Sequence, residues 1–161
     1  MERPLPSFGL EFEEMVVPRL LERRAAQTPD RDFLVFDEES WTFGAVDSAA
    51  SRLAGGLASI GVEKDAKVAL FLPNCPDFIN MFFAIAKLGA ASAPINTAYR
   101  GYMLEYVLND TACRYLVADA DYLDRIRDAL PNLQHLECVI VRGEQAADVV
   151  LDGIRTVSLA D

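Results

Sequence analysis

Apolar residues recur along the chain in two ways, at every third or fourth position in some segments and as unbroken runs in others. The helical spacing is clearest between residues 46 and 60, where six positions share one face: Val46, Ala49, Ala50, Leu53, Leu57 and Ile60. Thr42 stands where this helix needs an N-cap, and Gly61 stands where it needs a C-cap. The same spacing and the turn residues around it predict further helices at 18–27, from the 73–77 turn to Gly89, at about 102–109 and at 122–130.

An unbroken apolar run at 68–72 predicts a strand that is covered on both faces. Further strands are predicted at 91–95, 115–118 and 138–141, and 138–141 is the last predicted strand. Near the start, 33–36 and 41–43 flank an acidic turn and predict a β-hairpin. Because strands and helices alternate with short connections, the sequence predicts an α/β fold with a mostly parallel sheet and helices on both faces.

One folded unit and two flanking segments account for the 161 residues. Residues 1–15, which include two prolines and four glutamates, predict an irregular lead-in. Residues 16–141 carry the whole alternation and predict one α/β subdomain, long enough to bury most of its apolar surface. Residues 142–161 are loosely patterned and predict the start of a connection to further chain.

Charge and cysteine content exclude several classes of function. The 25 acidic and 15 basic residues give a net charge of −10, and nucleic acids and membrane surfaces bind clustered lysine and arginine, so neither is expected as a partner. The most apolar stretch, 78–88, is too short to cross a bilayer, and residues 1–10 do not form a secretory signal. Cys75, Cys113 and Cys138 contain no C-x-x-C pair, which argues against a zinc site and a disulfide framework. We expect a cytoplasmic, reduced protein.

Two segments carry possible ligand chemistry, each with a structural alternative. Gly56–Gly61 has the glycine spacing of a phosphate loop, but Val62 and Glu63 follow where Lys and Ser or Thr belong, so helix packing and a C-cap are favoured. Asp119, Asp121 and Asp124 could hold Mg²⁺. Capping is favoured there, with Asp121 as the N-cap of the following helix and Asp124 near its positive end.

Two further candidates are explained as well by packing. Cys75 precedes a predicted helix start, a position that can activate a thiol, but His135, the only histidine, lies far along the chain, so a buried inert thiol is favoured. Phe78, Phe82 and Ala86 have the spacing of a core-facing helix surface, which is favoured over a ligand pocket. The sequence contains no G-x-S-x-G or H-E-x-x-H motif.

An ordered series of segments resembles the opening of the AMP-forming acyl-CoA synthetases, members of the adenylate-forming (AMP-binding) superfamily. The similarity covers roughly residues 16–141 and is strongest at 86–96, where the chain is similar to the family's K-x-G-A-x-x-x-P-x-N segment. The other segments, in chain order, are Thr28–Asp30, Trp41–Asp47, Ser51–Leu57, Gly61–Val62, Val68–Asn74 and Asn96–Gly101. Within the family, the last of these resembles carnitine/crotonobetaine-type and related fatty-acyl CoA ligases more than luciferases.

The resemblance implies a ligase that activates a carboxylic acid with Mg-ATP to an acyl-adenylate and then transfers the acyl group to CoA. The family's Ser/Thr/Gly-rich phosphate loop, its nucleotide-binding segments and its C-terminal catalytic lysine do not occur in these residues. The chain therefore resembles only the N-terminal portion of such an enzyme, with the rest of the same polypeptide as its partner. ATP, Mg²⁺ and CoA are expected for the full-length enzyme, and none is expected to bind this portion tightly.

No catalytic or metal-binding residue of the family can be assigned to a position of this chain. Tyr99 and Arg100 follow a predicted strand and are candidates for the CoA channel of the whole enzyme, with surface packing as the alternative. Tyr102 and Met103 stand where the family usually has an acidic residue. Two other functions stay open: an adenylation domain that loads an amino or aryl acid onto a carrier protein, and a non-catalytic module with the same fold.

Overall fold

A five-stranded parallel sheet forms the centre of the molecule. The computed structural model describes residues 15–143 and 146–160, so the predicted lead-in at 1–15 lies almost wholly outside the described residues. Every pair of neighbouring strands in the sheet is parallel. In their order across the sheet, the strands are β4 (Ala91–Pro94), β3 (Lys67–Phe71), β5 (Tyr115–Asp119), β6 (Cys138–Arg142) and β7 (Arg155–Ser158).

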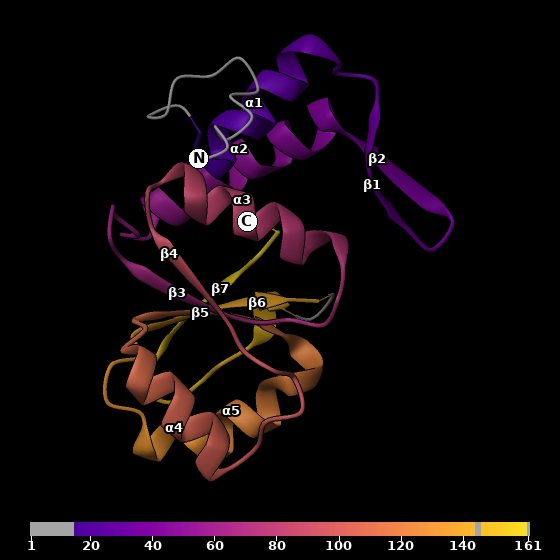
Figure 1. Cartoon of the computed structure of the whole chain (residues 1–161). Coiled ribbons are helices and arrows are strands. Elements are labelled where there is room, and N and C mark those ends of the chain that lie inside the picture. Colours follow the sequence, from indigo (N-terminus) through magenta and orange to yellow (C-terminus); the bar gives the residue numbers. More distant parts are fainter. Residues whose placement is uncertain (1–14, 144–145, 161) are drawn as a thin grey trace, which may run out of the picture.

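Helices lie on both faces of this sheet (Figure 1). On one face are α2 (Phe43–Ser59) and α3 (Pro76–Lys87), and on the other are α4 (Tyr102–Thr111) and α5 (Leu123–Ala129). The predicted α/β class, with a mostly parallel sheet and helices on both faces, is confirmed.

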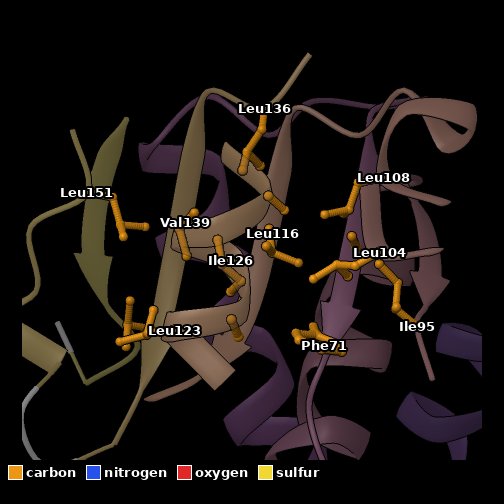
Figure 2. Packing of buried hydrophobic residues seen from close by; sticks show 14 of the residues in the cluster. Phe71, Ile95, Leu104, Leu108, Leu116, Leu123, Ile126, Leu136, Val139 and Leu151 are labelled. Atoms are coloured by element: carbon orange, nitrogen blue, oxygen red, sulfur yellow. The ribbon is translucent and has the colours of Figure 1, made fainter. Parts of the chain in front are cut away.

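Strand β5 shows why the apolar runs in the sequence are unbroken. Its five residues are all buried. Leu116 and Ala118 pack with the residues of α4 and α5, whereas Tyr115 and Val117 pack with those of α2 and α3. Figure 2 shows the first of these clusters, in which Leu116 lies among side chains from the neighbouring strands and both helices. Because each face meets a different hydrophobic cluster, no position of the strand can be polar without a burial cost.

Both ends of α2 are held by the residues that the sequence indicates. The Thr42 hydroxyl accepts a hydrogen bond from the Ala45 N–H at 3.2 Å. Gly61 ends the helix with a φ of +102°, a left-handed conformation that favours glycine, and its carbonyl accepts a hydrogen bond from the Tyr115 hydroxyl at 2.7 Å. Gly56–Gly61 therefore ends a helix, whereas a phosphate loop must begin one.

A helix and a hairpin precede the main sheet: α1 (Val17–Gln27), β1 (Asp32–Phe36) and β2 (Glu39–Thr42). The two strands pair antiparallel and form a separate sheet, with Trp41 opposite Leu34, which confirms the predicted hairpin (Figure 1). The ring of Phe33 lies 4.9 Å from that of Phe43 on α2 and 5.8 Å from that of Phe83 on α3. These aromatic contacts attach the hairpin to the helices.

The sheet extends beyond the last predicted strand. β7 pairs in parallel with β6, from Cys138 opposite Arg155 to Val141 opposite Ser158. Its residues are exposed or half-buried, as befits an edge strand, so they carry no apolar run. The prediction that 138–141 is the last strand is therefore wrong.

The buried face of α3 also differs from the prediction. Met81, Ala84 and Ile85 are the buried apolar residues of this helix, whereas Phe82 is only half-buried and Ala86 lies outside the buried cluster. Phe78 packs against the margin of that cluster. The core-facing side of α3 is therefore rotated about the helix axis, by about one residue position, from the face predicted by Phe78, Phe82 and Ala86.

An ion-pair network at Lys87 joins α1, α2 and α3. The Lys87 ammonium lies 2.9 Å from Glu22 Oε1 and 2.8 Å from Asp47 Oδ1, and the Lys87 side chain is only 11% exposed. Burial lowers the pKa of Lys87, but its interactions with the two carboxylates outweigh that effect and raise it. The hydrogen bond from Lys87 holds the pKa of Glu22 below its usual value of 4.5.

We expect Lys87→Met to lower the free energy of unfolding by about 1–3 kcal/mol at pH 7, because it leaves two carboxylates facing each other without a cation. Urea unfolding followed by circular dichroism measures this loss. The same substitution at the exposed Lys64 serves as the control and should change stability by less than about 0.5 kcal/mol.

The loss should depend on pH with a defined sign. A pKa that is lower in the folded protein contributes stability above the unfolded value, and that contribution disappears as the pH falls through the folded value. The difference between the original chain and Lys87→Met should therefore stay nearly constant from pH 7 down to about 5 and shrink as the pH falls below 4.5. A difference that grows on acidification would contradict the role assigned to Glu22.

Candidate functional site

The candidate site lies at the C-terminal ends of the parallel strands, which we call the carboxyl edge of the sheet. From β3 the chain passes through α3 on one face to β4, and from β5 it passes through α5 on the opposite face to β6. The connections after β3 and β5 therefore diverge, although these two strands are neighbours. Such a divergence opens a crevice at the carboxyl ends of the strands, which is where doubly wound sheets bind ligands.

An arginine and two carboxylates meet at this edge. Arg142, at the end of β6, donates through Nε to Asp77 Oδ2 and through a terminal nitrogen to Asp119 Oδ2, both at 2.6 Å. The Asp119 side chain is only 10% exposed. The hydrogen bond with Asp77 raises the pKa of Arg142, burial opposes this, and the bond with Asp119 adds to the rise. The guanidinium thus stays charged and ties the start of α3 to the ends of β5 and β6.

The predicted aspartate cluster does not gather around a common point. Asp119 Oδ1 accepts the Asp121 N–H at 3.1 Å, and Asp124 pairs with Arg127 at 2.8 Å on the surface of α5. Among the described residues, no group of three or more His, Cys, Asp or Glu side chains could hold a metal ion. The favoured interpretation, local capping, is right in kind but wrong in residue. Asp119 caps the short 3-10 turn before α5, and α5 itself has no side-chain cap.

A hollow of about 400 Å³ lies beside the ends of β3 and β4. The residues that line it are apolar or carry amide and hydroxyl groups: Leu72, Pro73, Asn74, Phe78, Pro94, Ile95, Asn96 and Thr97. The Asn96 side chain accepts the Ala98 N–H at 2.9 Å, which fixes the start of the loop toward α4. These groups can orient a ligand by shape and hydrogen bonding, but none of them can transfer a proton near neutral pH.

The two CoA-channel candidates lie in that loop and differ in exposure. Tyr99 is half-buried against the cluster beneath α4 and α5, and its N–H donates to the Asn96 carbonyl at 3.0 Å. Arg100 is exposed. Gly101 follows at the start of α4 with a φ of +49° and a ψ of −133°, a conformation that favours glycine. Tyr99 thus packs, Arg100 is open to solvent, and a role of either in a CoA channel stays a prediction.

Cys75 lies at the carboxyl edge of the sheet, whereas His135 lies at the N-terminal ends of the strands. Cys75 is buried between the end of β3 and the start of α3, whereas the exposed His135 precedes the start of β6. Because β3 and β6 point the same way, the end of one and the start of the other lie at different edges. The structure does not bring them together, which agrees with a buried inert thiol.

Sequence reasoning missed Asp77 and Arg142. Each stands next to a strong signal, since Asp77 follows the proline that opens α3 and Arg142 ends the apolar run of β6. Their contact spans 65 positions of sequence. One pattern could have identified them. It is a charged residue at the end of a buried strand, together with an oppositely charged residue in the first turn of a helix that begins at the same edge.

Comparison with known proteins places this doubly wound unit in a family. Residues 21–153 match the family model described as AMP-binding enzyme. The chain therefore belongs to the AMP-binding enzymes, an adenylate-forming family, and the resemblance seen in the sequence is confirmed.

Relatives and a solved structure give the same result. The chain is 29% identical over 160 residues to the acyl-CoA ligase SID4 of Ajellomyces capsulatus, across 87% of this chain and 27% of SID4. It is 31% identical over 131 residues to the putative acyl-CoA synthetase YngI of Bacillus subtilis strain 168, across 77% of this chain and 24% of YngI. The structure of the anthranilate CoA ligase AuaEII in complex with anthranoyl-AMP matches 94% of this chain and 28% of its own, with a TM-score of 0.80 and 26% identity.

The chain spans about a quarter of the length of these curated relatives. Within the described residues, no helix is both long enough and apolar enough to cross a membrane.

We expect Arg142→Met to lower the free energy of unfolding by about 2–3 kcal/mol, because it leaves the buried Asp119 carboxylate without its cation. Urea unfolding at pH 7 measures the loss. Arg114→Met is the matched control, since the side chains of its ion pair with Glu137 are 60% and 55% exposed and the pair should contribute little to stability. Equal losses in the two variants would show that Arg142 is an ordinary surface residue.

Proposed function

We propose that this chain forms one wall of the cleft that binds the acid and the nucleotide in an AMP-forming acyl-CoA synthetase. The complete enzyme uses ATP and Mg²⁺ to convert a carboxylic acid into an acyl-adenylate, and pyrophosphate leaves from ATP in this step. It then transfers the acyl group to CoA. The 161 residues alone are catalytically incomplete, and the rest of the same polypeptide is their partner.

The match of residues 21–153 to the AMP-binding enzymes carries this proposal. The names of SID4 and YngI, an acyl-CoA ligase and a putative acyl-CoA synthetase, support CoA as the acceptor. The name of AuaEII, which was solved with anthranoyl-AMP, supports an acyl-adenylate as the activated species. The share of about a quarter of the curated relatives' length supports incompleteness.

The hollow at the carboxyl edge suits the role of a wall. Its carboxamides and apolar side chains can position a ligand, whereas the charged groups nearby are engaged with one another. The exposed Arg100, next to this hollow in sequence, has the charge to meet a phosphate of CoA.

Magnesium and the phosphates of ATP do not fit the described residues. The Arg142 guanidinium already lies between the two carboxylates of this edge, so they offer no free site for a cation. The start of α3 is unsuited to an anion, because Pro76 lacks an N–H and Asp77 is negatively charged. We therefore assign the phosphate and metal contacts to other parts of the enzyme.

A chimera tests the proposal. In YngI, the segment that matches this chain is replaced by this chain, and exchange of labelled pyrophosphate into ATP is measured with a panel of fatty and aryl acids. We expect acid-dependent exchange by the chimera and none by the isolated chain, for which calorimetry should also show no micromolar binding of ATP. YngI without the matched segment is the control and should be inactive.

Two results would change the conclusion. If the isolated chain, free of any full-length enzyme, converts ATP and a carboxylic acid into AMP, incompleteness is wrong. If a chimera that activates an acid transfers the acyl group to a carrier protein but not to CoA, the chain belongs to a carrier-loading adenylation domain instead.

A further inference from the structure

Arg125, on α5, contacts the loop between β4 and α4. Its guanidinium donates a hydrogen bond to the Thr97 carbonyl at 2.5 Å and lies over the ring of Tyr122, 4.8 Å from the ring centre. A guanidinium is planar, so it can stack on a ring and donate a hydrogen bond at the same time, whereas a lysine ammonium is a point charge without that plane. Arg125 therefore ties this loop to α5 at the carboxyl edge.

The support beneath Arg125 is part of the core. Tyr122 packs against the hydrophobic cluster under α4 and α5, and its ring lies 5.0 Å from that of the fully buried Phe71 on β3. Arg125 itself is half-buried. Because the stacked guanidinium cannot move freely, the hydrogen bond that it donates restricts the carbonyl that accepts it.

Three contacts hold the loop just before Arg100. The Asn96 side chain accepts the Ala98 N–H at 2.9 Å, and Tyr99 packs against the same cluster as Tyr122. The Thr97 carbonyl, held by Arg125, is the third contact. The Arg100 side chain is exposed, so its place depends on the backbone that these contacts fix.

We propose that Arg125 is a positioning residue for the transfer of the acyl group to CoA. By holding the Thr97 carbonyl it fixes the backbone from which Arg100 meets a phosphate of CoA. The inference rests on the proposed function, which gives that phosphate to Arg100. The contacts with the phosphates of ATP and with the metal ion belong to other parts of the enzyme, so only the CoA-dependent step should respond to a change at Arg125.

The first test follows the loop in the isolated 161-residue chain by hydrogen exchange of backbone amides. In Arg125→Met we expect the amides of Ala98 and Tyr99 to exchange roughly tenfold faster relative to that of Val117 in the buried strand β5, which reports on opening of the whole sheet. Arg127→Met is the matched control on the same helix, because Arg127 pairs with Asp124 at the surface. An unchanged ratio in Arg125→Met would overturn the proposal.

The second test separates the two steps of the reaction in the chimera with YngI. Arg125→Met should raise the KM for CoA by about 5- to 30-fold, the factor expected for the loss of one fixed contact, and should leave acid-dependent pyrophosphate exchange, measured without CoA, unchanged. Arg125→Lys keeps the charge but not the planar group, so it should restore the KM only in part. Arg127→Met should change neither step.

A double variant tests whether Arg125 acts through Arg100. Arg100→Met alone should raise the KM for CoA. Adding Arg125→Met to it should raise the KM little further, because the loop then carries no cation to position. If the two effects multiply, Arg125 acts by another route and the proposal is wrong.

The outcomes separate this inference from the proposed function. An unmodified chimera without acid-dependent exchange contradicts the proposed function and, with it, the inference. Exchange and acyl-CoA formation with an unchanged KM for CoA in Arg125→Met contradict the inference alone. If pyrophosphate exchange falls as much as acyl-CoA formation, Arg125 has a general structural role and the inference is also wrong.

Discussion

The structure depends on the burial of the parallel sheet on both of its faces. β5 is buried at every position, and its alternate side chains enter two separate hydrophobic clusters. This condition requires helices on each side and places the diverging connections after β3 and β5 at one edge. The candidate site and the Arg142 cluster lie at that edge as a result. A groove between α2, α3 and the strands β6 and β7 leaves part of one face of the sheet less covered.

Local signals in the sequence predicted most of the fold because they act over a few residues. Thr42 caps the start of α2 through a contact three positions along the chain. Gly61 ends the helix through its own backbone conformation. Strands β3, β5 and β6 were found because double burial forces an unbroken apolar run. β7 was missed for the opposite reason, since an edge strand with half-exposed residues needs no such run.

The charged groups could not be predicted in the same way. The Lys87 and Arg142 pairs each join residues 65 positions apart, and only the folded sheet brings their partners together. A lysine or an aspartate on a helix has many possible partners in the sequence. Which partner lies beside it, and whether the pair is buried, is decided only by the fold. The hollow at the carboxyl edge could be expected from the order of the elements, but its lining of amides and apolar groups depends on the loops.

The position of the single tryptophan has a consequence for spectroscopy. Trp41 lies in the hairpin, which forms a sheet of its own and is attached to α2 and α3 by aromatic contacts (Figure 1). Its fluorescence therefore reports on the hairpin and its attachment, whereas far-ultraviolet ellipticity is dominated by the helices on the main sheet. Two-stranded ribbons are marginal by themselves, so detachment of the hairpin would alter emission before the sheet unfolds. Coincidence of the two signals would then measure how cooperatively the hairpin and the sheet unfold.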